Sequence, residues 1–187
     1  PDAGLCHGGL GRLAACYLDS MTTLDIPAAG YSICYELGIF RQRIVDGQQV
    51  ELPDNWKDIG GAWLMPKPQE TEEVLFGGTV RKFWDNGRLH VVPEGATKVL
   101  AVPCDMEITG YGTEHVNPLR LWDAKSPTPV DMSLFSQGEY LRASEQEAMA
   151  ETIAKILYPE DHDDEGKARR LKQQSFFVSA SVQSIRR

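Results

Sequence analysis

The sequence predicts an α/β fold with an antiparallel, β-rich middle and long helices toward its C-terminal end. Three observations carry that prediction: a glycine-rich run followed by an apolar pattern of helical period, a strong hairpin signal near the centre, and helix-forming amphipathic runs late in the chain. We divide the single unit of residues 1–187 into a loop and helix (1–25), a mostly β region (26–135), a helix (136–158) and a final loop and helix (159–187).

The first helix follows three glycines. Apolar residues then recur three and four positions apart, which predicts one buried face: Leu10, Leu13, Ala14, Tyr17, Leu18, Met21 and Leu24. Glycine allows a ligand to approach the backbone, and the unpaired amides of a helix start favour an anion. Most such turns bind nothing, and the run matches neither the dinucleotide fingerprint nor a Walker loop. His7 either donates to a bound phosphate or caps the helix.

The middle of the chain predicts short antiparallel strands. The strongest signal is Asp85-Asn86-Gly87, because Asn-Gly supplies the positive φ angles of a two-residue hairpin turn. Residues 47–73 are rich in Gly, Pro and Asp and are expected to be an irregular connection. The expected strands are residues 30–35, 39–44, 79–84, 88–92, 98–103, 105–109 and 117–122.

Two helices are predicted after the β region. Residues 138–157 form an amphipathic run that Pro159 ends. A second helix starts near Glu165, and we expect the polypeptide to continue beyond it. Its expected apolar positions are Leu171, Phe176, Phe177, Val178 and Val182.

Composition narrows the classes of function. A net charge of −8 argues against nucleic-acid binding, and no apolar run approaches the roughly 20 residues of a membrane helix. The cysteines form no C-x-x-C pair, so Cys16 and Cys34 are expected to be buried thiols of a cytoplasmic protein. A metal site at Cys6 and His7 lacks further ligands. No metal, nucleic-acid or membrane partner is therefore expected.

The acidic loop of residues 160–165 has two interpretations. It is not a calcium loop of the EF-hand type, because Lys172 stands where a bidentate Glu is required. Its acidic residues suit a solvated helix N-terminus, since negative charge there complements the helix dipole. The alternative is a loop that faces a substrate. No complete catalytic constellation is visible elsewhere in the chain.

Four segments resemble the α-glucan phosphorylases, the family of glycogen, starch and maltodextrin phosphorylases. They are the glycine-rich run of residues 2–20, residues 35–42, residues 119–122, and residues 157–161 with 165–167 and 170–174. The chain departs from the family pattern at Cys6-His7, where the family has Gly-Asn. It departs again at Asp163-Asp164, where some members carry aromatic residues.

The resemblance implies an enzyme that cleaves terminal α-1,4-glucosidic bonds with inorganic phosphate and releases glucose 1-phosphate. It implies an internal portion of the N-terminal domain of a glycosyltransferase-B-type enzyme whose cofactor is pyridoxal phosphate. The family's cofactor lysine lies in a later domain, so the chain alone is expected to be inactive. The residues that match substrate- and phosphate-facing positions are His7, Gly8, Gly9, Leu10, Asp161 and His162.

The partners implied are an α-1,4-glucan, phosphate, and a second copy of the enzyme. The helix of residues 138–157 resembles the family's tower helix, which packs across a homodimer interface. The alternative is a non-catalytic carbohydrate-binding or dimerisation module derived from the family. The departures at Cys6-His7 and Asp163-Asp164 favour that alternative.

Overall fold

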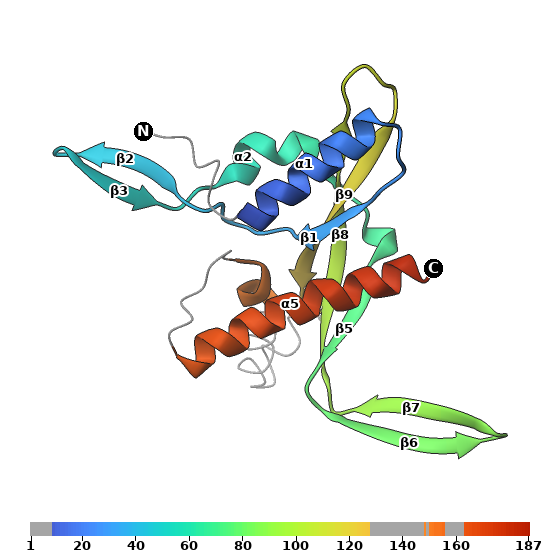
Figure 1. The fold of residues 1–187 in the computed structure, drawn as a ribbon. Helices are drawn as coiled ribbons and strands as arrows, with labels where there is room; N and C mark the ends of the chain where they lie inside the picture. Colours follow the sequence, from blue (N-terminus) through green and yellow to red (C-terminus); the bar gives the residue numbers. More distant parts are fainter. Residues whose placement is uncertain (1–8, 128–147, 149, 156–162) are drawn as a thin grey trace.

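The computed structural model describes residues 9–127, 148, 150–155 and 163–187 (Figure 1). The labelled helices are α1 (Gly9–Thr23), α2 (Trp56–Gly60) and α5 (Asp164–Ile185), and the 3₁₀ turns are η1 (Gly61–Trp63) and η2 (Pro68–Glu70). The strands are β1 (Gly30–Ile33), β2 (Arg41–Val45), β3 (Gln48–Leu52), β4 (Met65–Pro66), β5 (Glu72–Phe76), β6 (Thr79–Asp85), β7 (Arg88–Glu94), β8 (Thr97–Thr109) and β9 (Val116–Lys125). The predicted α/β class is confirmed.

The main sheet is mixed rather than purely antiparallel. Its order is β1-β9-β8, and β4 and β5 both pair with the far edge of β8. All pairs are antiparallel except β1 with β9, which run parallel. The two strands expected at 98–103 and 105–109 are one continuous strand. It runs through Pro103, whose carbonyl accepts a hydrogen bond from the Lys67 amide at 2.8 Å.

α5 closes the main core of the described residues. Phe176 and Ala180 are fully buried against Val99, Ala101 and Trp122 of the sheet. The expected apolar face of this helix is partly wrong, because Leu171, Val178 and Val182 are exposed. Gln173 and Ser181 are buried in their place because each finds a partner: Gln173 donates to the Ile153 carbonyl, and Ser181 Oγ accepts from Trp122 Nε1 at 3.0 Å.

α1 lies against the opposite face of the sheet, and Figure 1 shows the two helices on either side of β1. Its Leu18 contacts the Gly30–Leu119 pair, three residues along β9 from Trp122 and therefore on the other face. The expected buried face is mostly wrong. Leu10 is 84% exposed and Tyr17 58% exposed, because within the described residues only the second half of α1 reaches the sheet.

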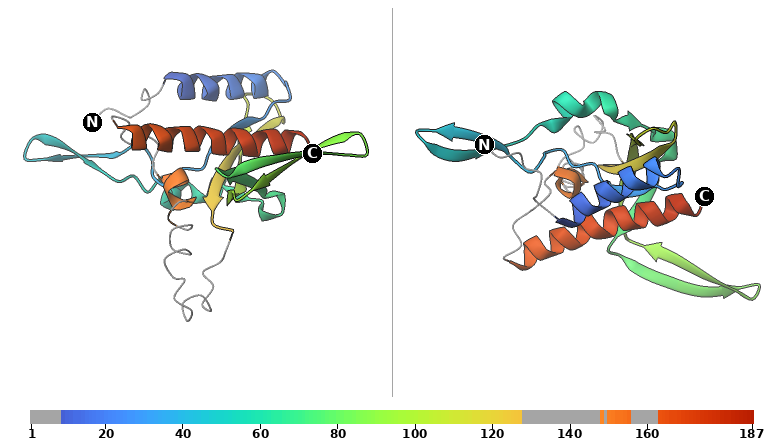
Figure 2. Two further views of the ribbon diagram at one scale, coloured as in Figure 1. Left: turned by 90° about the horizontal axis from the view of Figure 1, so that it is seen from below. Right: turned by 45° about the horizontal axis from the view of Figure 1, so that its top comes forward.

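Two ribbons, β2–β3 and β6–β7, project from this body (Figure 2). The predicted hairpin at Asn86-Gly87 is confirmed. The expected irregular segment 47–73 is wrong in part, since it contains β3, α2, β4 and the start of β5. The β2–β3 turn is Asp46-Gly47, with φ angles of 51° and 77°. Asp-Gly is the same kind of two-residue turn signal as Asn86-Gly87, but no hairpin was predicted at Asp46-Gly47.

Most of the predicted helix 136–158 lies outside the described residues. Within it, residues 148 and 150–155 are helical, and Ala150, Ile153 and Ala154 join the core beneath α5. Pro159 and the first residues of the acidic loop also lie outside the described part. The final helix is confirmed as α5.

Candidate functional site

The N-terminal end of α1 is open in the described structure. Gly9, Leu10 and Gly11 are exposed, and no acidic side chain occupies the first helical turn. A Cβ atom placed on Gly9 or Gly11 would meet no described atom within 4 Å. Packing within the described chain therefore does not require glycine at either position. A group from outside the described residues that comes close to the helix backbone would require glycine there.

The other end of α1 is held by Asn117 of β9, which is 2% exposed. Its amide nitrogen donates to Thr22 Oγ1 and to the Ile26 carbonyl, both at 3.0 Å. Its amide oxygen accepts from the Ala28 N–H at 2.9 Å. A buried amide with these bonds fixes the direction of α1. Contacts at the C-terminal end of α1 thus set the direction in which its N-terminal end points.

Only part of the predicted site falls among the described residues. Gly9 and Leu10 lie at the open start of α1, while His7, Gly8, Asp161 and His162 lie outside the described residues. The described part of the acidic loop begins at Asp163, which caps α5 and accepts a hydrogen bond from the Gly166 amide at 2.7 Å. Asp164 and Glu165 follow in the first turn and are exposed. These residues suit the solvated-terminus interpretation.

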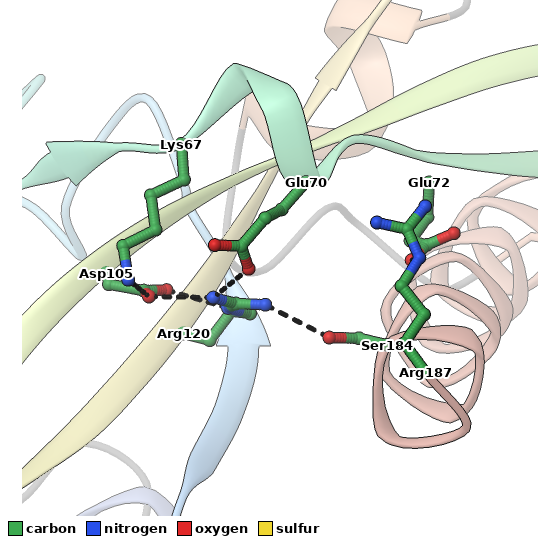
Figure 3. A network of polar contacts seen from close by, with 7 residues as sticks. All are labelled: Lys67, Glu70, Glu72, Asp105, Arg120, Ser184 and Arg187. Carbon is green, nitrogen blue, oxygen red and sulfur yellow. Dashed lines mark hydrogen bonds and ion pairs between the residues drawn. The ribbon is translucent and has the colours of Figure 1, made fainter.

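A network of charged residues lies elsewhere in the sheet and is centred on Arg120 (Figure 3). Arg120 Nε and Nη2 donate to the two carboxylate oxygens of Asp105, each at 2.8 Å. Nη2 also lies 2.6 Å from Glu70 Oε2, and Nη1 donates to Ser184 Oγ at 3.0 Å. Lys67 Nζ completes the group, 2.8 Å from Asp105 Oδ2. The network joins β8, β9 and η2 to α5.

The electrostatics of this network favour its charged form. Burial raises the pKa of Asp105, but hydrogen bonds from Arg120 and Lys67 outweigh it and leave that pKa lowered. The hydrogen bond to Asp105 likewise raises the pKa of Arg120. Two cations face two carboxylates, so the formal charges cancel. This group was not predicted from the sequence, although charged residues within buried strands indicate that partners are needed.

Arg187 approaches the same side of the sheet. Its Nε lies 3.1 Å from Glu72 Oε1, although the geometry is that of an ion pair without a hydrogen bond (Figure 3). Glu72 is 7% exposed. Together with Ser184, this contact connects the last turn of α5 and the residues after it to the sheet.

The two thiols of Cys34 and Cys104 interact on the opposite face of the sheet. A hydrogen bond from Cys104, opposed by burial and aided by Lys57, lowers the pKa of Cys34 from 9.0 to about 7. The same contact raises the pKa of Cys104. The expectation of a buried Cys34 is confirmed, whereas Cys16 is exposed, contrary to expectation. Its helix face points away from the described sheet.

Neither a metal cluster nor a membrane helix occurs in the described part of the chain. No three His, Cys, Asp or Glu side chains there gather to hold a metal ion. No helix among the same residues is both long and apolar enough to cross a bilayer.

Comparison with known proteins decides the family. The sequence profile described as "Carbohydrate phosphorylase" matches residues 1–187. The chain belongs to the carbohydrate phosphorylase family. It is 49% identical over 185 residues to "Glycogen phosphorylase" of Chlamydia pneumoniae, covering 98% of this chain and 22% of that protein.

Further glycogen phosphorylases give the same result. The chain is 45% identical to that of Saccharomyces cerevisiae, with coverage of 100% of this chain and 21% of the relative. It is 46% identical to that of Bacillus subtilis, with coverage of 98% and 22%. The chain thus spans about a fifth of the length of these phosphorylases.

The phosphorylase family uses pyridoxal phosphate, and the described residues do not form a site for it. A lysine that binds such a cofactor covalently is activated by burial in a pocket. Every lysine of this chain is described, and each is half-buried or exposed. Lys67, Lys98, Lys125 and Lys167 are in addition engaged in ion pairs. No catalytic step is therefore assigned to that cofactor within this chain.

Proposed function

We propose that this chain is part of the N-terminal domain of a glycosyltransferase-B-type α-glucan phosphorylase, which releases glucose 1-phosphate from glucan ends with inorganic phosphate. The open start of α1 carries the proposal. Its exposed glycines have no packing role among the described residues, and helix-start amides stabilise anionic oxygen without a mobile side chain. Family membership supplies the reaction class.

In this proposal the chain binds and orients substrate but does not complete catalysis. The amides of Gly8, Gly9 and Leu10 face phosphate and the terminal sugar, and His7 donates to phosphate. Asp161 and His162 belong to a loop that gates the cleft. The cofactor and the remaining phosphate ligands come from other parts of the enzyme. The 187-residue chain by itself is expected to be inactive.

The enzyme is further proposed to be a cytoplasmic homodimer that contacts its partner through residues 138–157. The free thiols of Cys34 and Cys104 suit a reducing compartment. Size measurement of the full reading frame tests the dimer. Deletion of residues 138–147 is then expected to yield a monomer.

The decisive experiment incubates the full-length protein with maltoheptaose and inorganic phosphate and measures glucose 1-phosphate. Gly9→Ala is the informative variant, because its methyl group meets no described atom and alanine favours a helix. We expect kcat/KM to fall about tenfold or more through a lost close contact to substrate. Gly61→Ala is the control, since Gly61 is equally free of near neighbours.

Two outcomes would contradict the proposal. One is retention of glucan with no phosphate-dependent turnover, which supports a carbohydrate-binding module instead. The other is full activity of Gly9→Ala, which would remove the start of α1 from the site. Circular dichroism of both variants checks that the helix is intact.

A further inference from the structure

A groove separates the first turns of α5 from the helical residues before it. Its volume is about 500 Å³. One wall consists of Ala148, Thr152 and Ile153, and the other of Glu165, Ala168, Arg169 and Lys172. The α5 residues recur three and four positions apart, so they occupy one face of that helix. The volume lies within the range of pockets that hold small organic ligands.

Arg169 lines this groove, and its guanidinium has a donor without a described partner. Its Nε is buried and has no hydrogen-bond partner in the described part of the chain. Among the described residues, its Nη2, which shares an edge of the guanidinium with Nε, makes only a long 3.4 Å contact, with Glu165 Oε1. The Glu165 side chain is 80% exposed and therefore weakly held. An unpaired buried N–H group calls for an acceptor.

The other lining groups define what that acceptor is. Lys172 lies one helical turn further along and forms no ion pair with any described residue, so a second positive charge faces the groove. The Thr152 hydroxyl is already used, because it donates to the Ala148 carbonyl at 2.6 Å. Ala148, Ile153 and Ala168 supply apolar contact surface. The groove thus combines an Arg with an unsatisfied donor, an ammonium and an apolar wall.

We propose that this groove binds a phosphate monoester with a small apolar or ring-shaped body. The Nε–Nη2 edge of Arg169 matches two phosphate oxygens, displacing Glu165, and Lys172 contacts the third. A phosphate monoester carries close to two negative charges at neutral pH, which the two cations balance. The organic body packs against Ala148 and Ile153. None of these residues belongs to the proposed catalytic site at α1.

The test titrates phenyl phosphate into the full protein and follows the methyl signals of Ala148, Thr152 and Ala168 by NMR. We expect saturable shifts that weaken as salt rises. Arg169→Gln should weaken binding about tenfold or more, and Lys172→Gln should weaken it severalfold, since each removes a charge-assisted contact. Arg170→Gln, the neighbouring arginine that does not line the groove, should leave the affinity unchanged.

Several results would overturn the proposal. Phenol binding as tightly as phenyl phosphate would make the groove merely apolar. Inorganic phosphate binding as tightly would remove the role of the organic body. Unchanged affinity in both Arg169→Gln and Lys172→Gln, or no saturable shifts at millimolar phenyl phosphate, would exclude the site. Because Lys172 is exposed, Lys172→Gln remains informative even if Arg169→Gln folds poorly.

Discussion

The β6–β7 ribbon and the body formed by the main sheet with α5 use the same kinds of interaction with different consequences. Both contain large aromatic residues and an Arg–carboxylate pair. In the body these groups are covered: Trp122 and Phe176 are 0% exposed. In the ribbon Trp84 is 72% exposed, and the Arg81–Glu94 pair faces solvent. Burial, not the type of contact, therefore decides how much each interaction stabilises the fold.

Neither the β6–β7 nor the β2–β3 ribbon is covered by another element among the described residues. An isolated two-stranded hairpin is at best marginally stable in water. In the β6–β7 ribbon, Val80, Leu89 and Val91 point to the same side as Trp84 and are exposed with it. The apolar core of the body is therefore covered by other described residues, whereas the apolar residues on this face of the ribbon are not.

The largest expected difference follows from removing one aromatic residue from each region. Phe176→Ala should lower the free energy of unfolding by about 3 to 5 kcal/mol, because it leaves a cavity beneath α5. Trp84→Ala on the ribbon should change it by less than about 1 kcal/mol, since its ring is largely hydrated already. Urea unfolding of both variants measures the contrast, and equal losses would contradict it.

The second contrast concerns the ion pairs. Arg120→Met removes the bidentate partner of Asp105, whose side chain is 3% exposed, and should destabilise the fold by about 3 kcal/mol. Arg81→Met breaks the exposed pair with Glu94 and should have an effect within about 1 kcal/mol. Chemical denaturation at low and high salt checks both. Matching effects would mean that the ribbon pair is shielded by a partner.

A third prediction concerns pH and applies to the body alone. Between pH 7 and 9 the folded chain has lost the Cys34 proton while the unfolded chain keeps it, so stability should rise with pH across that window. The contribution disappears as pH falls through 7. Above pH 9 the raised pKa of Cys104 reverses the slope, because the folded chain then holds the extra proton.

Urea unfolding as a function of pH measures this effect. Cys34→Ser should abolish the rise between pH 7 and 9, whereas Cys16→Ser, at an exposed thiol, should retain it. A rise that survives in Cys34→Ser would assign the effect to another group.

The smallest expected effect lies in the ribbon turns. Asp46 and Asn86 both have positive φ angles, of 51° and 48°. Asp46→Gly and Asn86→Gly should each change stability by less than about 1 kcal/mol, because the relief of backbone strain is offset by greater freedom in the unfolded chain. Ribbon amide exchange measures the local effect. A loss of several kcal/mol would show that the aspartate or asparagine side chain has a structural role.

The same two turns show which hairpins can be predicted from sequence patterns and which cannot. Asn86-Gly87 stands between runs rich in Val, Leu and aromatic residues, so the hairpin could be predicted. Asp46-Gly47 precedes Gln48-Gln49, whose polar side chains gave no strand signal, although the backbone pairing is as regular. In α5 the apolar pattern is misleading, because it predicts that Leu171 is buried, whereas Leu171 is exposed. Gln173 and Ser181 are buried instead, since each has a hydrogen-bond partner that is distant in sequence.

The candidate site could be predicted only where the residues are close together in sequence. The glycine-rich start of α1 is such a run, and Gly9 and Leu10 are exposed at an open helix start. The Arg120 network is not, since its contacts reach Asp105 and Ser184, which are 15 and 64 residues away. The groove beside α5 likewise depends on two helices whose packing no local pattern specifies.

The parallel pairing of β1 with β9 joins Gly30 to Leu119. During synthesis on a ribosome, α1 and β1 emerge long before the strand that receives them exists. Closing so long a loop is entropically slow compared with forming either hairpin. Leu18, which lies against this pair in the folded chain, therefore stays exposed to water throughout that interval.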